Sequence, residues 1–216
     1  MKKSNKILLG GFLAVLLLII TAHLTLYAKY KKSNRAVPVA SQAATFQNIK
    51  FVSLRNIAGG TVKFVNATQV ERGKDEAQYA RSGDTLLITG NDAGHGAAFN
   101  LPNSITVSVV NSSVSFKGES AAGNDPVIYL QNSKAVFGAE GPVRLGRLKL
   151  VASGNSTASF VGNVQANDLE VQLSGSAIED MQGDFGRLTI ITDSLSRVSL
   201  QSKHLLKANI KTITRE

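Results

Sequence analysis

The feature that most restricts the fold of this chain is a strand-and-turn unit that recurs through its second half. Residues 105–116 (ITVSVVNSSVSF) and 126–137 (PVIYLQNSKAVF) superimpose without gaps at an offset of 21 residues. A unit of about 20 residues cannot bury its own apolar face, so successive units must stack on one another. The later units begin at Leu148, Leu169 and Leu188, at spacings of 21 and 19 residues.

Within these units apolar and polar residues alternate with a period of two. Residues 61–65 (TVKFV), 85–89 (TLLIT), 105–109 (ITVSV) and 169–173 (LEVQL) all show it, and Gly, Asn or Ser residues follow. Alternation is typical of a half-buried strand, whereas a helix repeats every 3.6 residues. The strongest helical candidate, residues 69–79, is a charged run interrupted by a glycine and is more typical of a hairpin or a loop. We therefore predict an all-β body.

Stacked units of nearly constant length predict a β-solenoid similar to a parallel β-helix, with coils of about 20 residues. Stacking at about 4.8 Å per coil pairs the backbone of each strand with its neighbours and lines the interior with apolar side chains. Asn111 and Asn132 fall at matching turns, where Asn tolerates the left-handed backbone conformation. A β-sandwich also has short strands at regular spacing, but the constant repeat favours the solenoid. The alternating residues 208–215 are predicted to close the stack as a charged edge strand.

The start of the chain has a different character. Residues 7–28 form a run of 22 residues without a formal charge. About 20 apolar residues of helix cross a hydrocarbon core about 30 Å thick, so we predict one N-terminal transmembrane helix. A cleaved signal peptide has a shorter apolar stretch and a small residue where this chain has Leu26, so an uncleaved anchor is favoured. The predicted anchor residues include Ile7, Phe12, Leu17, Ile20, Leu24 and Tyr27.

The anchor divides the chain into four parts. A short basic leader covers residues 1–6, the anchor residues 7–28, a basic flexible linker residues 29–45, and the β-solenoid domain residues 46–216. Bases lie on both sides of the anchor, so their distribution does not set its orientation. We expect a single-pass protein of the cell membrane with a periplasmic or otherwise extracytoplasmic body, because a signal-like start sends its C-terminal side across. The membrane-flanking bases are Lys2, Lys3, Lys6, Lys29, Lys31, Lys32 and Arg35.

The positive charge of the chain is concentrated in this same region. The formal net charge is +9, but residues 1–35 hold seven of the 24 Lys and Arg residues and no acid. The other 17 bases face all 15 acids, which leaves the body nearly neutral. Such a body attracts phosphate backbones weakly, so we predict no nucleic-acid partner. The lack of Cys excludes disulfides, thiolate metal sites and Cys nucleophiles.

Motifs that support catalysis are scarce in the body. His95 and His204 lack the converging partners that a metal site needs, so we expect a solvated loop residue and a surface residue, respectively. There is no GxSxG nucleophile motif and no phosphate-binding loop. The acidic cluster of Glu179, Asp180 and Asp184 is explained by the preference of acidic residues for turns. We therefore predict no catalytic residue, metal ion or cofactor, and no enzymatic activity.

One unit carries a resemblance to a known family. Residues 169–183 (LEVQLSGSAIEDMQG), with the short strand at 188–190 (LTI), resemble the autotransporter-adhesin head GIN domain family, which is common in Bacteroidetes. The opening of the body is similar to the family's first strands at residues 46–49 (FQNI), 60–65 (GTVKFV) and 83–88 (GDTLLI). The complete LSGS turn occurs only once. The resemblance implies a right-handed β-helical domain of the cell envelope, and it supplies no catalytic residues.

These observations predict a membrane-anchored extracytoplasmic module with a non-catalytic binding, adhesion-like or structural role. Its partners would be the membrane and then glycans or envelope proteins, with Glu170, Gln172 and Gln201 as candidate contact residues. The alternative is a self-assembling scaffold similar to the bactofilin polymers, which requires open solenoid ends. A polysaccharide-acting β-helix enzyme is the third hypothesis.

Overall fold

The β body forms a unit of its own. In the computed structural model, Met1–Val37 and Pro38–Glu216 are separate units, and the second contains the body. The predicted leader, anchor and most of the linker lie outside the described residues, and no helix within the described part is long and apolar enough to cross a membrane. The described residues are 37–38, 45–67, 69–72, 77–90, 97–102, 104–119, 125–180 and 182–213.

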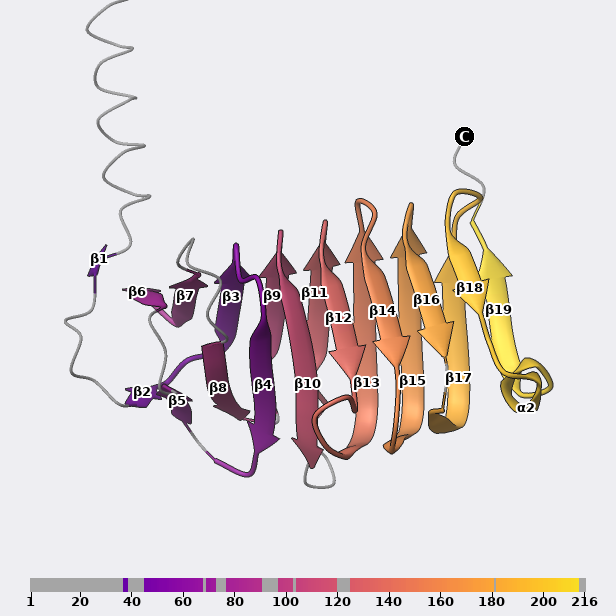
Figure 1. Cartoon of the computed structure of the whole chain (residues 1–216), viewed down its shortest axis with the longest axis horizontal. Helices are drawn as coiled ribbons and strands as arrows, with labels where there is room; N and C mark the ends of the chain where they lie inside the picture. The colour runs from indigo at the N-terminus through magenta and orange to yellow at the C-terminus, as the bar shows by residue number, and fades with distance from the viewer. Residues whose placement is uncertain are drawn as a thin grey trace, which may run out of the picture. The chain divides into compact units, whose positions relative to one another are not determined.

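The body is an all-β solenoid, as predicted, with 67% of the described residues in strands and 3% in helix. Two long stacks of strands run side by side along it (Figure 1). In spatial order, the first stack, here called the β13 face, consists of β6 (Gln78–Ser82), β7 (Thr85–Thr89), β3 (Phe51–Arg55), β9 (Thr106–Val110), β11 (Val127–Gln131), β13 (Val143–Ser153), β15 (Val164–Ser174), β17 (Asp184–Thr192) and β19 (Ala208–Thr212).

The second stack faces the first across the core and is here called the β14 face. A narrow third side joins them, because the ends of some strands continue around the corner, where Gly118 pairs with Val143 and Val143 pairs with Val164. In spatial order, the β14 face consists of β2 (Thr45–Gln47), β5 (Gln69–Arg72), β8 (Ala97–Pro102), β4 (Gly60–Val65), β10 (Ser113–Glu119), β12 (Lys134–Phe137), β14 (Thr157–Phe160), β16 (Ala177–Asp180) and β18 (Arg197–Ser199).

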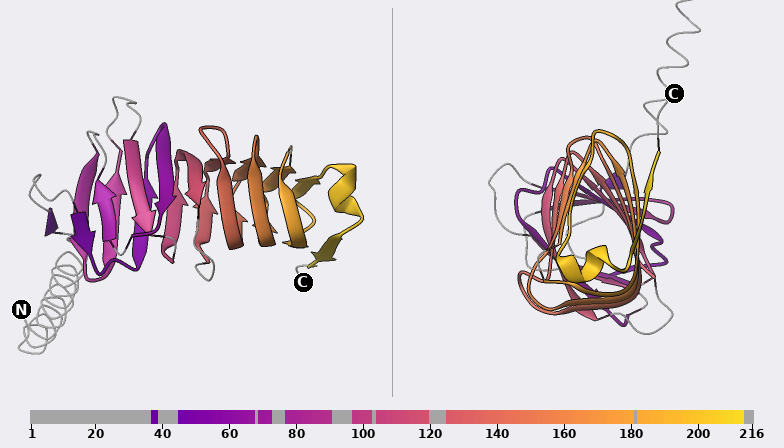
Figure 2. Two further views of the ribbon diagram at one scale, coloured as in Figure 1. Left: turned by 90° about the horizontal axis from the view of Figure 1, so that it is seen from below. Right: turned by 90° about the vertical axis from the view of Figure 1, so that its right-hand side faces the viewer.

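The body has a short helix, and a two-residue strand precedes its first coil in the sequence. The helix α2 (Ser202–Leu205) follows β18, and Figure 2 shows that it lies across the C-terminal end of the stack, between the two faces. The two-residue strand β1 (Val37–Pro38) falls within the predicted linker. Ser202–Leu205 is the one helix within the described part of the chain.

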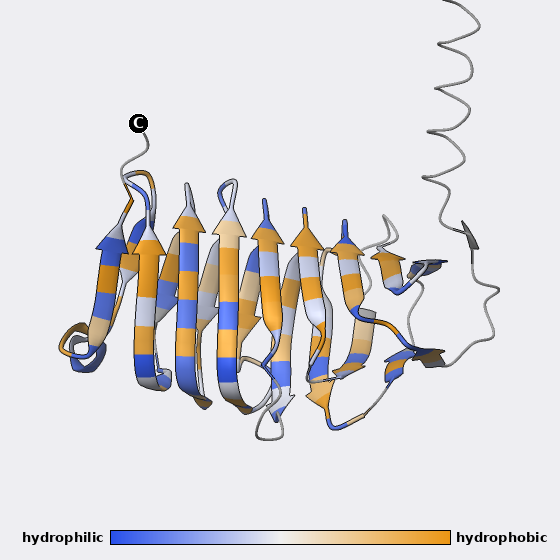
Figure 3. Ribbon diagram, turned by 180° about the vertical axis from the view of Figure 1, so that it is seen from behind, coloured by the Kyte–Doolittle hydropathy of each residue, from blue (hydrophilic) through white to orange (hydrophobic). Residues whose placement is uncertain are grey.

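The repeat predicted from the sequence is the coil of the solenoid. Val107 pairs with Ile128, and Leu148, Leu169 and Leu188 lie in one register across β13, β15 and β17. Side chains at every second position of each strand therefore all point inward. Figure 3 shows the resulting alternation of hydrophobic and hydrophilic bands along the strands of the β13 face. This in-register stacking buries every second residue and leaves the rest to form the outer surface.

The N-terminal coils depart from a simple winding order. β3 pairs on one side with β9 and on the other with β7, so the coil of β7 and β8 lies outside the coil that precedes it in the sequence. β6 is antiparallel to β7, and β5 is antiparallel to β8. The segment at residues 69–79 thus contributes to strands in two different stacks, and β5 and β6 do not form the hairpin that was one of the two predictions for it.

A column of aromatic rings fills the core. Phe64, Phe116, Phe137 and Phe160 stack face to face, with centroid separations of 5.8, 4.9 and 4.8 Å. Each side chain is at most 1% exposed. Offset stacking of this kind adds about 0.5–1.5 kcal/mol per pair to the burial of the rings. Phe116, Phe137 and Phe160 occupy the same inward position in three adjacent coils. Phe64 joins them from two residues farther along β4, where its register partner is Gly118.

His204 ends this column, and its predicted place on the surface is wrong. Its side chain is only 2% exposed, the ring lies 5.0 Å from that of Phe185, and Nε2 is 2.8 Å from the carbonyl oxygen of Gly183. Phe185 in turn meets Phe160 edge-on at 5.3 Å. The single turn of α2 places His204 over the last aromatic ring, where an imidazole can both pack and form a hydrogen bond.

The corner between the two faces is built from matching polar residues. Asn56, Asn111, Asn132 and Asn155 all have positive φ angles, between 48° and 62°, which confirms the left-handed turns predicted at the two central positions. A buried serine follows three of these residues. The Ser133 hydroxyl donates to the carbonyl of Gln131 and accepts from the backbone N–H of Ser112. These bonds satisfy backbone groups that the turn would otherwise leave unpaired.

Candidate functional site

Outward side chains of the β13 face form rows that cross the strands. Tyr129, Val151, Gln172 and Ile191 are in register on four successive strands, β11 to β17. Tyr129 is 44% exposed. Because the coils stack without offset, a ligand lying along such a row meets a rigid and evenly spaced set of side chains.

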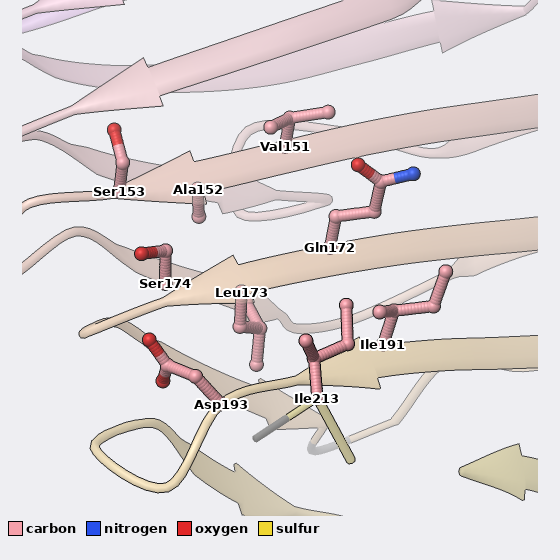
Figure 4. A pocket seen from close by; sticks show the side chains of 9 residues that line it. All are labelled: Val151, Ala152, Ser153, Gln172, Leu173, Ser174, Ile191, Asp193 and Ile213. Carbon is pink, nitrogen blue, oxygen red and sulfur yellow. The ribbon is translucent and has the colours of Figure 1, made fainter. Parts of the chain in front are cut away.

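Part of this row forms one wall of a shallow groove with a volume of about 220 Å³. The groove crosses β13, β15 and β17 near their C-terminal ends. Ile213, just after β19, closes one side, and its backbone N–H donates to the carbonyl of Thr192. Figure 4 shows the lining residues: Val151, Ala152, Ser153, Gln172, Leu173, Ser174, Ile191, Asp193 and Ile213.

The groove has an apolar part and a polar part. The side chains of Ile191 and Ile213 lie next to each other in Figure 4, whereas the hydroxyls of Ser153 and Ser174 lie toward the strand ends. In Figure 4 the Gln172 amide lies between Val151 and Ile191, on the side away from the two serines. Such a surface offers contact area to an apolar ligand face and hydrogen bonds to polar groups beside it.

A polar network fixes the Gln172 amide. Gln172 Nε2 donates to Glu170 Oε1 at 3.1 Å, and Lys149 Nζ contacts the same oxygen at 2.9 Å. The hydrogen bond from Lys149 lowers the pKa of the Glu170 carboxyl, and the nearby positive charges of Lys149 and Arg147 act in the same direction against the effect of burial. Glu170 is therefore ionised at neutral pH and holds both neighbours in place.

The carboxylate at the end of the groove, that of Asp193, binds mainly to backbone N–H groups. Asp193 accepts hydrogen bonds from the backbone N–H of Gly175 at 3.1 and 3.2 Å, from the N–H of Leu195 at 3.2 Å and from the Ser196 hydroxyl at 2.6 Å. The residue is buried. A carboxylate with these donors holds the last corner of the solenoid, and its oxygens are committed to that role.

Two residues of the predicted acidic cluster, Glu179 and Asp184, lie on different sides of the solenoid. Glu179 lies on the β14 face and accepts a hydrogen bond from Ser159, whereas Asp184 begins β17 on the narrow side. Arg187, which follows in the sequence, pairs instead with Asp168 at 3.4 Å. Within the described ranges no three His, Asp or Glu residues lie close enough to hold a metal ion. His95 lies outside the described residues.

Two of the three predicted contact residues lie at the groove. Gln172 lines it and Glu170 orients Gln172, while Gln201 lies beside α2 away from the groove. The apolar members Val151 and Ile191 were missed. Their signal is visible in the sequence, because each is an apolar residue at a position where the alternation calls for a polar one. The predicted anchor and membrane-flanking residues lie outside the described part of the chain.

Comparisons of the chain with protein-family models, with curated proteins and with solved structures find no match.

Proposed function

We propose that this chain is a non-catalytic binding module of the cell envelope, and that the groove on the β13 face binds a glycan. The observation that carries the proposal is the composition of the groove, in which aliphatic side chains lie beside an oriented amide and two hydroxyls. Sugar rings have the matching chemistry, since each carries an apolar C–H face and hydroxyls at its edge. Amide and hydroxyl groups can both donate and accept hydrogen bonds, which suits the hydroxyls of a sugar.

The size of the groove favours a polymeric ligand. Sites for drug-sized ligands have volumes of about 300–1,000 Å³, and the groove holds about 220 Å³. It therefore accepts one small unit of a longer chain. The row that leads from the groove through Val151 to Tyr129 offers a path for further units, with an exposed aromatic ring as a stacking platform.

The envelope location rests on the first part of the sequence. The uncharged residues 7–28 with flanking bases support a single-pass membrane anchor, and the resemblance to the GIN domain family supports an extracytoplasmic body. Neither feature involves the groove, so the location and the ligand can be tested independently.

The location is tested with a protease and a tag placed after Glu216. If the body is extracytoplasmic, the tag is digested in intact cells or once the outer membrane alone is permeabilised. Protection until the inner membrane is broken would overturn the location and would favour the cytoplasmic scaffold hypothesis.

The ligand is tested by binding the full chain to a panel of cell-envelope and extracellular polysaccharides. Ile191→Asp places a charge in the apolar part of the groove, and we expect about a tenfold or greater loss of binding. Val136→Asp is the matched control, because Val136 is a half-buried aliphatic side chain on the outside of the β14 face. Gln172→Ala should also weaken binding, by removing the oriented amide.

Three results would overturn the glycan proposal. They are the absence of binding to every polysaccharide of the panel, equal losses in Ile191→Asp and Val136→Asp, and hydrolysis of the polysaccharide by the purified protein.

A further inference from the structure

The last coil of the solenoid exposes an unusual amount of apolar surface. Leu206 is 91% exposed and Leu205 58% exposed, and Ile210 on β19 is exposed as well. β17 is the only described strand that pairs with β19. We name this region the terminal surface, and it consists of Lys203, Leu205, Leu206, Lys207, Ile210 and Lys211.

The charge of this surface has one sign. Residues 194–213 contain four bases and no acid, whereas the body as a whole is close to neutral. Lys203, Lys207 and Lys211 are all exposed, and none forms an ion pair with an acidic residue of the described part. A partner of this surface must therefore be anionic, and it must also accept protruding aliphatic side chains.

We infer that the terminal surface docks on an anionic phospholipid membrane. Aliphatic side chains interspersed with Lys are the composition of segments that lie in the membrane interface, where the lysines meet lipid phosphates and the leucines enter the acyl region. A lipid surface needs no shaped pocket for a side chain as prominent as Leu206. A second copy of the chain fits poorly, because a symmetric contact would bring two sets of lysines together.

The fold holds these leucines outward. His204, between Lys203 and Leu205, is buried against Phe185 and lies within hydrogen-bond distance of the Gly183 carbonyl. This contact fixes the single turn of α2, so Leu205 and Leu206 cannot turn inward to the core without expelling the imidazole. The membrane contact is thus preorganised, which lowers the entropic cost of binding.

The test uses the full chain held in nanodiscs of neutral phosphatidylcholine and fixed to a sensor surface. Vesicles of phosphatidylcholine, with or without phosphatidylglycerol, are passed over it. We expect capture of the anionic vesicles and at least about tenfold weaker capture after the double change Leu205→Ser and Leu206→Ser, because binding scales with the apolar area inserted. Lys203→Glu with Lys207→Glu should reduce capture of the anionic vesicles by a similar factor.

Matched controls separate this surface from the basic N-terminal region, which all variants share. Phe51→Ser removes an aromatic side chain that is 46% exposed on β3, and Lys134→Glu reverses an exposed charge on β12. Both should capture vesicles like the original chain. Circular dichroism of each variant shows whether the β fold is kept.

Several results would overturn the inference. Equal capture of neutral and anionic vesicles would show that the lysines do not contribute to docking. Unchanged capture by the leucine double variant would show that the terminal surface is not the docking site. Self-association in analytical ultracentrifugation that the leucine variant abolishes, without any vesicle capture, would identify a second copy as the occupant. None of these results bears on glycan binding, because the altered residues do not line the groove.

Discussion

The two ends of the β body are finished in different ways. At the N-terminal end, strand direction reverses in β5 and β6, and the outermost strand of the β14 face, β2, has only three residues. At the C-terminal end the strands keep their direction, and a buried imidazole and a row of exposed lysines follow. Short edge strands and edge lysines are both known to discourage further strand pairing. Further strand pairing is thus limited at the N-terminal end by the direction and length of the backbone strands, and at the C-terminal end by side chains.

The aromatic column runs from β4 to the C-terminal end, and a break in it should have the largest effect on stability. Phe137→Ala removes a fully buried ring that stacks between Phe116 and Phe160. We expect a loss of about 3–5 kcal/mol in the free energy of unfolding, measured by urea denaturation. Phe51→Ala, at a half-exposed position, should change it by less than about 0.5 kcal/mol. Similar losses in both variants would contradict the column as the main core element.

The side-chain closure of the C-terminal end can be broken on its own. His204→Ala removes the ring above Phe185 and the hydrogen bond at Gly183, so we expect a loss of about 2–4 kcal/mol. Hydrogen exchange should accelerate in β18 and β19 and stay slow in β3 and β4. His204→Phe should recover part of the loss, since it keeps the ring contact. Equal acceleration at both ends would show that the two closures are not independent.

The serine corner tests whether the regular coils depend on their buried hydrogen bonds. Ser133→Ala leaves the buried N–H of Ser112 without its acceptor, and we expect a loss of about 1–3 kcal/mol by thermal or urea denaturation. Ser115→Ala, on the outer side of β10, is the matched control and should be nearly neutral. An equal effect of the two changes would show that the hydrogen bonds of the corner do not contribute specifically to stability.

The smallest effect concerns pH and compares two ion pairs of the body, Lys117 with Glu140 and Lys149 with Glu170. Hydrogen bonding from Thr61, followed by Lys117, lowers the pKa of Glu140, and hydrogen bonding from Lys149 lowers that of Glu170. A carboxyl whose pKa is lower in the folded state contributes stability above its unfolded pKa, and this contribution disappears as the pH falls through the folded pKa.

Both carboxylates are more than a third exposed, so each contribution should stay below about 1 kcal/mol. The urea midpoint of unfolding should therefore change slightly less between neutral and acidic pH in Glu170→Gln and in Glu140→Gln than it does in the original chain. A larger pH dependence in either variant would contradict the sign of the shift.

The sequence predicts the regular coils well for a physical reason. Residues at one position of the repeat, such as Val107 and Ile128, have the same surroundings, so selection for the same inward side chain produces a visible pattern. Asn111 and Asn132 are recognisable because few residues tolerate their backbone conformation.

The remaining features depend on contacts that alternation does not encode. Alternation assigns β3 and β7 their inward faces, but not their order in the stack, which depends on pairings such as that of β6 with β7 and of β5 with β8. His204 is buried because of where Phe185 lies, and Ile213 reaches the groove through a hydrogen bond from its backbone. None of these partners is close in the sequence.

The stacking of the coils also sets how the body responds to mechanical force. The hydrogen bonds between coils run along the long axis, so a pull along that axis stretches them one coil at a time instead of shearing many at once. Each detached coil of about 20 residues can extend to about 70 Å. Under tension along this axis the body would therefore lengthen stepwise and would absorb a sudden pull before it unfolds completely.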